Sequence, residues 1–354
     1  MIRLASRTAL GSAATLILAT LPLAAQNPPA PTPPPPPSVR ITGVGYLQYL
    51  YQVKDTANHQ NEFDVTRAYI NVLGSFGQVA TRITADVFGS GTSLGYRLKY
   101  AFAAYTPKGS PVTYRFGLMT TPWVDWEEAL WDYRMQGPVA VDRNGYMSSS
   151  DIGIGADGNF NQEQVDMQVM FLNGEGYGSA AAPGDKRKDV AGRLSLRVVG
   201  TDDGSRVGGL RITAYGQYGK PTGGGERSRL LGMVSYRSKL LTLAAEGGLT
   251  RDSSTATPTA LAKGTVISGY GVLHFSGSQA ALIARVDHVT PNSDAATTAP
   301  GYSNTRIIGG LSYQLTPNLR VLGDVDYLTY ANGTPTAALE AKRAQALFQA
   351  QFTF

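Results

Sequence analysis

The sequence predicts an all-β fold, a 16-stranded antiparallel transmembrane β-barrel with short periplasmic turns and long external loops. Apolar and polar residues alternate with a period of two from residue 38 to the last residue. The alternating segments number 16, and single-chain bacterial barrels have an even number of strands. The connections between them are alternately long and short. These observations together indicate a barrel whose strands have one face in lipid and the other in water.

The predicted strands have lengths that suit tilted membrane spans. The last strand shows the alternation most clearly, with Ala344, Phe348 and Phe352 on one face and mostly polar residues on the other. The terminal aromatic residue, Phe354, resembles the C-terminal signature that the outer-membrane assembly machinery reads. The 16 segments cover approximately residues 39–52, 63–73, 79–88, 96–106, 112–121, 151–159, 165–173, 189–198, 210–218, 228–238, 241–251, 266–275, 279–289, 305–314, 319–329 and 343–354.

The connection lengths indicate which end of the barrel faces outward. The connections that follow even-numbered strands are mostly tight turns, with one exception near 200–209. This pattern places both termini in the periplasm, and a repeated blade of a β-propeller is not seen. The connections that follow odd-numbered strands are mostly long and polar: 53–62, 89–95, 122–150, 174–188, 219–227, 252–265, 290–304 and 330–342.

Composition excludes several other classes of protein. The chain has 354 residues, no Cys and a formal net charge of +5. Without Cys there is no disulfide scaffold, no Cys-based metal site and no lipid-anchored N-terminal Cys. Beyond the N-terminal leader no apolar run reaches about 18 residues, which excludes a transmembrane helix. The charge excess is small for a nucleic-acid binder.

The N-terminus has the plan of an exported protein. Arg3 and Arg7 precede an apolar stretch that ends in small residues, which predicts a signal peptide over 1–25. Residues 26–38 are Pro-rich and predict an extended periplasmic linker. The barrel then covers 39–354, and we expect the chain in the bacterial outer membrane.

Basic residues occur on the polar face of four consecutive predicted strands. Because consecutive strands are neighbours in a barrel, we expect these residues to form a basic wall along the pore. Arginine on the lipid face would cost about 2–4 kcal/mol at the midplane, so their apolar alternates, Tyr100 and Leu118 among them, should face lipid. The alternative is that the cations are solvated lumen residues paired with carboxylates such as Asp86. The predicted wall comprises Arg67, Arg82, Arg97, Lys99 and Arg115.

The longest connection, 122–150, contains all three Trp residues and a group of carboxylates. An aromatic patch of this kind would not remain in water, so we expect the loop to fold inward as a constriction. Its acidic edge would then face the basic wall and create a transverse field. The alternative is an external cap or a contact within a trimer. The residues concerned are Trp123, Asp125, Trp126, Glu127, Glu128, Trp131 and Asp132.

Three stretches of the sequence, EFDVTRAYINVLGSFGQVATRITADV, VTYRFGLMTTPWVDWEEALW and SSSDIGIGADG, resemble the phosphate-selective porin O and P family. The resemblance covers about residues 40–160. It implies a 16-stranded homotrimeric outer-membrane pore whose lumen arginines attract anions, with Arg67, Arg82, Arg97 and Arg115 as the matching positions. Phosphate-selective members rely on lysines at the constriction, whereas 122–150 has none. A general or weakly selective pore is therefore the expectation.

The predicted function is that of a porin through which small hydrophilic solutes and ions, phosphate-like anions among them, diffuse passively with a preference for anions. The alternative is a structural or adhesive barrel without an open pore. The three His residues, His59, His274 and His288, are scattered, and no catalytic or metal motif is present. We therefore expect no enzyme activity, no cofactor, no metal and no nucleic-acid partner. The expected partners are outer-membrane lipids, the assembly machinery and other copies of the chain.

Overall fold

The computed structural model describes residues 36–90, 93–179, 186–221, 224–253, 259–294, 302–331 and 335–354. The predicted signal peptide, 1–25, and most of the linker, 26–38, lie outside the described residues. Within the described part of the chain, three short helices and one 3₁₀ helix accompany the strands. These are α1 (Pro122–Trp131), α2 (Ala140–Arg143), α3 (Ala337–Ala341) and η1 (Tyr177–Ser179). No helix among the described residues is long and apolar enough to cross a membrane.

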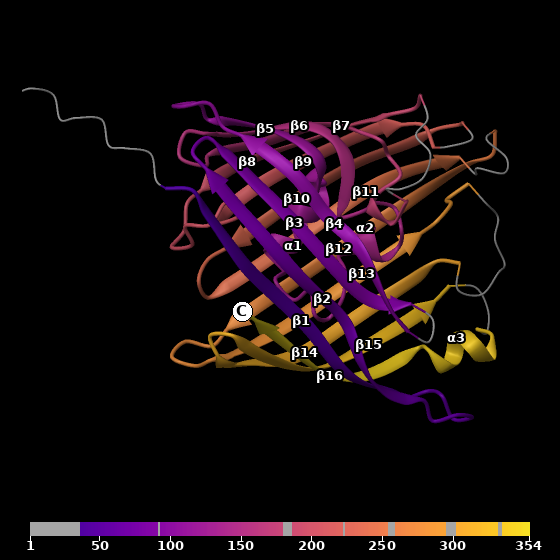
Figure 1. The fold of residues 1–354 in the computed structure, drawn as a ribbon. Helices are drawn as coiled ribbons and strands as arrows, with labels where there is room; N and C mark the ends of the chain where they lie inside the picture. The colour runs from indigo at the N-terminus through magenta and orange to yellow at the C-terminus, as the bar shows by residue number, and fades with distance from the viewer. Residues whose placement is uncertain are drawn as a thin grey trace, which may run out of the picture. The chain divides into compact units, whose positions relative to one another are not determined.

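The described strands, β1 to β16, form one closed antiparallel barrel (Figure 1). Each strand pairs with its neighbour in the chain, and β1 pairs with β16 to close the cylinder. The predicted fold class is confirmed, and most strand bounds differ from the prediction by only a few residues. The strands are β1 (Ser38–Gln52), β2 (Asn61–Phe76), β3 (Val79–Ser90), β4 (Ser93–Tyr105), β5 (Val112–Thr120), β6 (Ser150–Phe160), β7 (Val165–Leu172), β8 (Asp189–Val199), β9 (Gly209–Gly219), β10 (Arg227–Arg237), β11 (Leu241–Ser253), β12 (Leu261–His274), β13 (Ala280–Thr290), β14 (Asn304–Thr316), β15 (Leu319–Tyr330) and β16 (Ala344–Thr353).

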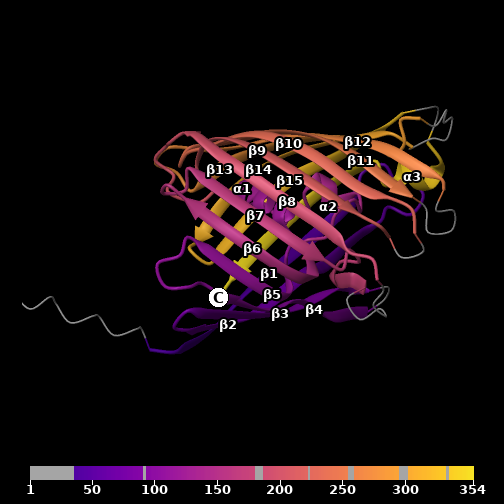
Figure 2. The ribbon, with the colours of Figure 1, turned by 90° about the horizontal axis from the view of Figure 1, so that it is seen from above.

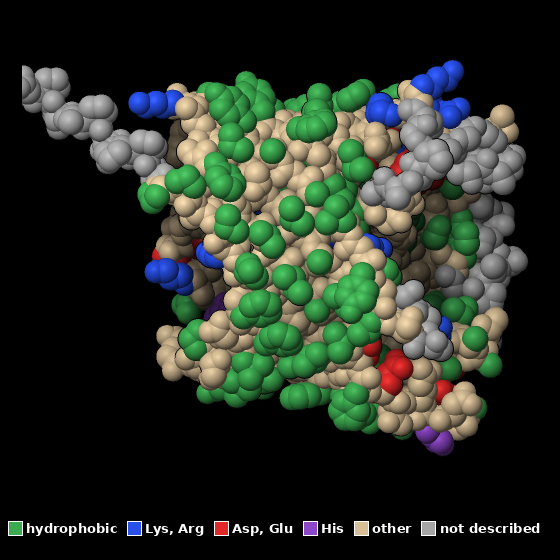
Figure 3. All heavy atoms as spheres, in the orientation of Figure 1, with side chains coloured by type: hydrophobic (Ala, Val, Ile, Leu, Met, Phe, Trp, Pro, Cys, Tyr) green, Lys and Arg blue, Asp and Glu red, His purple; other side chains and the backbone are tan. Residues whose placement is uncertain are grey.

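The alternation of the sequence places apolar side chains outside and polar ones inside. On β13, the side chains of Leu282 and Val286 are about half exposed. Those of Arg285 and Asp287, which point the other way, are buried within the barrel. Figure 3 shows apolar side chains over the middle of the outer wall, with charged side chains mainly towards the two ends. A wall of this kind suits lipid, because charged groups on a lipid-facing surface are costly.

Two connections differ from the simple pattern of loops and turns. The connection predicted at 89–95 is short, because β3 and β4 continue to pair as far as Ser90 and Ser93. The predicted exception near 200–209 is a connection that folds inward, and its Val207 is buried. This long connection therefore enters the lumen and does not stay at the end of the barrel.

The seam between β1 and β16 depends on glycine. A Cβ atom at Gly43 would lie 2.2 Å from the ring of Phe354, and a Cβ atom at Gly45 would lie 2.3 Å from the ring of Phe352. The two aromatic rings therefore cover glycine positions on the neighbouring strand. The terminal aromatic residue has a packing role at the point where the cylinder closes.

Candidate functional site: the narrowed lumen

The loop between β5 and β6, residues 121–149, lies inside the barrel. Figure 2 shows α1 and α2 within the cylinder of strands. α1 starts at Pro122. Proline suits the first position of a helix, because the N–H group that it lacks would have no partner within the helix. The helix lies against β7, β8, β11 and β12, and α2 lies against β12. We call the strands from β7 to β13 the packed side of the lumen.

The three Trp side chains of α1 attach it to the packed side. Each of Trp123, Trp126 and Trp131 is fully buried. The guanidinium carbon of Arg193 lies 4.0 Å from the ring centre of Trp126. Trp131 packs edge-on against Tyr270, with 5.3 Å between ring centres. The aromatic residues therefore anchor the loop and do not border the remaining opening.

Arginines of the packed side also hold the backbone of the loop. Arg193 donates a hydrogen bond of 3.0 Å to the carbonyl oxygen of Pro122, and Arg285 donates one of 3.1 Å to that of Pro138. Arg237 donates one of 2.7 Å to the carbonyl oxygen of Ala129. Buried carbonyl groups need such partners, and charge-assisted bonds are the stronger kind. These arginines thus stabilise the loop from its far side.

On the opposite side of the lumen, the predicted basic wall lies on β2 to β5. Three of its members are paired with carboxylates. Asp86 accepts hydrogen bonds from Arg67 at 2.8 Å and from Arg97 at 2.9 Å, and Arg115 pairs with Asp157. The alternative interpretation of the cations, as paired lumen residues, fits these three positions.

The other two members of the wall have neutral partners. Arg82 donates to Asn71 at 2.9 Å and to Thr84 at 3.0 Å. The ammonium group of Lys99 lies 3.3 Å from the hydroxyl of Tyr69. Within the described part of the chain, neither Arg82 nor Lys99 forms an ion pair with a carboxylate. Arg67 and Arg97 share the single carboxylate of Asp86, so the wall as a whole keeps a net positive charge, and Arg82 and Lys99 are its two members without an ion pair.

A β-bulge changes the predicted orientation of Tyr100. Thr84 faces Tyr100 across the β3–β4 pair, whereas Ala85 faces Leu98, so that Lys99 is an extra residue. Lys99 and Tyr100 are both buried, and the guanidinium carbon of Arg82 lies 4.3 Å from the Tyr100 ring. The prediction that Tyr100 faces lipid is therefore wrong. It also fails at Leu118, which is 4% exposed near the point where the chain turns inward.

The acidic edge of the loop faces the basic wall, and its charge is largely compensated. Three carboxylates on one face of α1 or just after it border the opening. Each forms an ion pair with an arginine, so the loop presents salt bridges rather than free anions. The pairs are Asp125–Arg206 at 2.6 Å, Glu128–Arg134 at 2.8 Å and Asp132–Arg320 at 3.4 Å.

Glu127 does not belong to this edge, although the sequence grouped it there. Its side chain is fully buried on the packed side, close to the carboxyl group of Glu246 on β11. Burial raises the pKa of the Glu127 carboxyl well above its usual range, and the neighbouring Glu246 raises it further. The prediction that Glu127 faces the basic wall is therefore wrong.

A hollow of about 320 Å³ remains between β1 to β4 and the loop. We call it the constriction hollow. It brings together two of the predicted basic residues and three of the predicted acidic ones; Arg67, Arg97, Arg115 and the three Trp residues do not line it. The charged side chains that line it are Arg82, Lys99, Asp125, Glu128, Asp132, Arg134 and Arg206.

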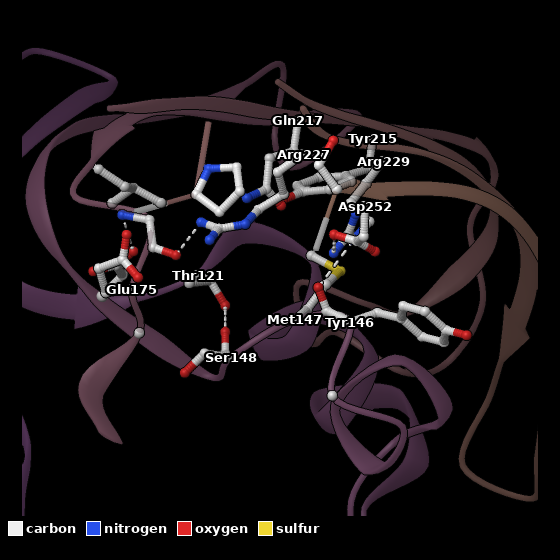
Figure 4. Close-up of a pocket in the computed structure, with 17 residues that line it drawn as sticks. Thr121, Tyr146, Met147, Ser148, Glu175, Tyr215, Gln217, Arg227, Arg229 and Asp252 are labelled. Carbon is white, nitrogen blue, oxygen red and sulfur yellow. Dashed lines mark hydrogen bonds and ion pairs between the residues drawn. The ribbon is translucent and has the colours of Figure 1, made fainter. Parts of the chain in front are cut away.

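A second hollow, of about 350 Å³, lies behind the returning end of the loop (Figure 4). Arg229 of β10 donates a hydrogen bond of 2.9 Å to the carbonyl oxygen of Tyr146 and pairs with Asp252 at 2.7 Å. Thr121 donates to the carbonyl oxygen of Ser148 at 2.5 Å. The contact between Thr121 and Ser148 joins the two ends of the loop, and the Arg229–Asp252 pair offsets one positive and one negative charge at this hollow.

Sequence reasoning missed Tyr177 in η1. β5 turns inward after Thr120, and β4 pairs with it only from Ala101 to Tyr105. η1 lies against β4 and β6. The Tyr177 hydroxyl accepts a hydrogen bond of 2.7 Å from Arg97 and lies 3.3 Å from a carboxylate oxygen of Asp86. Tyr177 thereby joins the β7–β8 connection to the basic wall, and no motif in the sequence marks it.

The arrangement contains no candidate for a metal centre. Among the described residues, no group of three or more His, Asp or Glu side chains could hold a metal ion. Nδ1 of His288 lies 2.8 Å from the hydroxyl of Thr305 on the adjacent strand.

Solved structures with a similar fold include outer-membrane porins. The structure of OmpF from Salmonella typhi in complex with daunomycin has a TM-score of 0.63 at 12% identity, covering 89% of this chain and 97% of that one. An anion-selective porin from Comamonas acidovorans has a TM-score of 0.62 at 11% identity, covering 90% of this chain and 100% of that one. The trimer form of OmpT, an outer-membrane protein from Vibrio cholerae, has a TM-score of 0.61 at 10% identity, covering 90% of this chain and 99% of that one. No protein-family model and no curated protein matches the sequence. At these identities the likeness shows that the chain has the porin fold.

Proposed function

We propose that this chain is an outer-membrane porin, through which small hydrophilic solutes and ions diffuse passively with a preference for anions. Phosphate-like anions are among the proposed solutes, in keeping with the resemblance to the porin O and P family. We further propose export by the signal peptide and assembly as a homotrimer. The barrel fold, its apolar outer wall and its polar lumen support the membrane and the pore.

The observation that carries the anion preference is the imbalance of charge at the constriction hollow. Its three acidic residues are each paired with an arginine, whereas Arg82 and Lys99 have only neutral partners. A close ion pair has a weak field at a distance, while an uncompensated cation attracts anions. In a narrow, partly apolar passage this attraction is stronger than in bulk water.

The two cations lie on a wall that also offers hydroxyl groups. Tyr46, Tyr69 and Tyr100 line the same hollow. Their hydroxyls are hydrogen-bond donors that could replace part of an anion's hydration shell as it passes. Cations together with neutral donors favour a transient and weakly selective interaction, which suits a solute that must also leave.

Recordings in planar lipid bilayers test this proposal. The purified, refolded chain should give stepwise conductance, and in a salt gradient its reversal potential should show anion preference. Protein with native β-structure that gives no conductance would favour the alternative, a structural or adhesive barrel. A reversal potential that indicates cation preference would contradict the proposed role of Arg82 and Lys99 in attracting anions.

A competition experiment addresses the solute class. If phosphate enters the constriction hollow, phosphate added to one side should reduce the chloride current more than sulfate of equal ionic strength. Equal effects of the two anions would indicate a general anion-preferring pore. The absence of any effect would argue against an anion site in the passage.

A further inference from the structure

The connection between β8 and β9, residues 200–208, is much longer than a chain reversal requires. The next turn at the same end of the barrel, between β10 and β11, spans only 238–240, and hairpin turns of about two to five residues suffice to join antiparallel strands. The extra residues fold into the lumen, where Val207 is buried. We call residues 200–208 the inner turn. Strand pairing alone does not account for its length.

The inner turn is held in place by hydrogen bonds of its own. Asp203 accepts a hydrogen bond of 2.7 Å from the N–H of Ser205, and short polar side chains that bond to the backbone in this way stabilise turns. The hydroxyl of Thr201 donates a hydrogen bond of 2.5 Å to the carbonyl oxygen of Arg237, at the end of β10. The inner turn is therefore attached to the neighbouring strand and presents Arg206 at a defined place in the lumen.

Arg206 contacts the first turn of α1. Its Nη2 atom lies 2.6 Å from a carboxylate oxygen of Asp125 and 2.9 Å from the backbone carbonyl oxygen of the same residue. Its guanidinium carbon lies 5.7 Å from the ring centre of Trp126. A guanidinium that binds both the carboxylate and the carbonyl group of one residue restrains its side chain and its backbone together. Arg206 thus restrains the beginning of α1.

A second link joins the inner turn to the other end of α1. Arg237 pairs with Asp203 of the inner turn at 2.8 Å and donates a hydrogen bond of 2.7 Å to the carbonyl oxygen of Ala129. Carbonyl groups in the last turn of a helix have no partner within the helix, and a cation near them is favourable. The inner turn is therefore connected to α1 at both of its ends.

Arg206 also contributes to the charge of the constriction hollow. It lines this hollow together with Asp125, and 38% of its side chain is exposed. Because Arg206 comes from the inner turn and not from the basic wall, it places a positive charge on the acidic side of the opening. Without Arg206, Asp125 would face Arg82 and Lys99 without this ion pair. A carboxylate in that position would repel anions and attract cations.

We propose that the inner turn supports the constriction, with Arg206 as the positioning residue that holds α1 in place and offsets the charge of Asp125. The inference rests on the proposed function, because it concerns the selectivity of the same passage. The charge of Arg206 maintains the anion preference, and its hydrogen bonds limit the movement of α1. The two effects are separable, since neutralising Asp125 as well restores the balance of charge but not the hydrogen bonds.

Reversal potentials of the purified full chain in planar bilayers test the effect of charge. In Arg206→Ala the ratio of anion to cation permeability should fall about two- to threefold, the effect of one unit charge several ångström from the path of an ion in water. Asp125→Asn should raise the ratio by a similar factor, and the double variant should return it close to the wild-type value. Arg206→Lys keeps the charge and should keep the ratio. The matched control, Arg251→Ala, removes an arginine from an ion pair outside the constriction hollow and should leave the ratio unchanged.

Quenching of tryptophan fluorescence by acrylamide tests the support of α1 and needs no conductance. All three Trp residues of the chain lie in α1, and all are buried. Arg206→Ala and the double variant should both have a higher quenching constant than the wild type, because both lack the hydrogen bonds from Arg206 to Asp125. Arg251→Ala should match the wild type. Circular dichroism and the shift of the folded barrel on electrophoresis establish that each variant is folded.

The inference is overturned if Arg206→Ala has the permeability ratio and the quenching constant of the wild type, or if Arg251→Ala changes them as strongly. A double variant that keeps the low ratio of Arg206→Ala would reject the offset of charge. If Arg206→Ala does not fold, Asp125→Asn decides the same point, because an unchanged ratio there contradicts the offset. If the wild type gives no conductance, the proposed porin function fails, and the quenching constants still decide whether the inner turn holds α1.

Discussion

The ammonium group of Lys99 lies 3.3 Å from the hydroxyl of Tyr69 and 4.5 Å from the centre of its ring. The alternation of β4 directs this lysine into the lumen, and a neutral phenol is its hydrogen-bond partner. A tyrosine holds the position of the cation without cancelling its charge. Lys99 thus places a positive charge at the constriction hollow, although the loop 122–150 contains no lysine.

Neutralising the two unpaired cations should reduce anion preference. In the variants Lys99→Gln and Arg82→Gln, we expect the reversal potential in a salt gradient to shift towards cations, and the double variant should shift further. Lys99→Arg keeps the charge and should retain the preference. Arg40→Gln, at the exposed start of β1, is the matched control. If the two single neutralising variants and their double variant all have the wild-type reversal potential, the basic wall does not determine selectivity.

Replacing both partners of one salt bridge of the loop by alanine should widen the passage without changing its net charge. Glu128 and Arg134 pair at 2.8 Å, and both border the constriction hollow. The double variant Glu128→Ala, Arg134→Ala should increase single-channel conductance and leave the reversal potential nearly unchanged. Arg251→Ala with Glu226→Ala removes a pair outside that hollow and should have no effect. An unchanged conductance in the first variant would show that the loop edge does not limit the current.

Glu127 should make the barrel less stable as the pH rises. Its pKa in the folded state is raised by burial and by Glu246, so the folded state holds its proton to a higher pH than the unfolded chain does. Stability is then lost between the ordinary glutamate pKa and the raised one. Glu127→Gln should remove this slope and stabilise the barrel at neutral pH by on the order of 1–3 kcal/mol.

Thermal unfolding in detergent at several pH values measures this effect. All three Trp residues lie in α1, so their fluorescence reports on the packing of the loop as well as on unfolding. Glu62→Gln, an exposed change at the start of β2, serves as the control. The same pH dependence in Glu127→Gln and in the wild type would contradict the buried carboxyl as its source.

Tyr177 should stabilise the wall where β5 turns inward. Tyr177→Ala removes the ring that lies 4.1 Å from the guanidinium carbon of Arg97 and the hydroxyl that contacts Asp86. We expect a lower unfolding temperature and noisier single-channel currents. Tyr177→Phe keeps the ring and should have a smaller effect. If the two variants behave alike and like the wild type, η1 is not part of the functional wall.

The sequence was sufficient to predict the barrel because lipid and water impose opposite requirements on adjacent residues. A strand with one wet and one apolar face has a period of two, and side-chain exposure alternates in this way from Leu282 to Asp287, although the buried Ile283 is apolar. Turn and loop lengths then distinguish the two ends. No long-range contact is needed for either inference, which is why strand bounds agree closely.

The site was predicted less completely, for two physical reasons. The bulge at Lys99 inserts one residue into β4, and simple alternation cannot show such an insertion; Tyr100 was assigned to the wrong face for this reason. Within the loop, Asp125, Glu128 and Asp132 have the spacing of one helical face, from which Glu127 is excluded. Recognising the helix from Pro122 onward would have separated Glu127 from that face. The arginines that pair with these acids are distant in the sequence and could not be assigned.

The position of α1 against the packed side makes the opening eccentric, between one arc of strands and a single short helix. The outer face of the barrel must be apolar around its whole circumference. The opening, by contrast, is bordered by the loop 121–149 and by the few side chains of the strands opposite it. If the chain is the porin proposed above, substitutions in that loop should change which solutes pass while every hydrogen-bonded strand pair stays intact. The stability of the barrel and its proposed permeability would then be determined by different stretches of the chain.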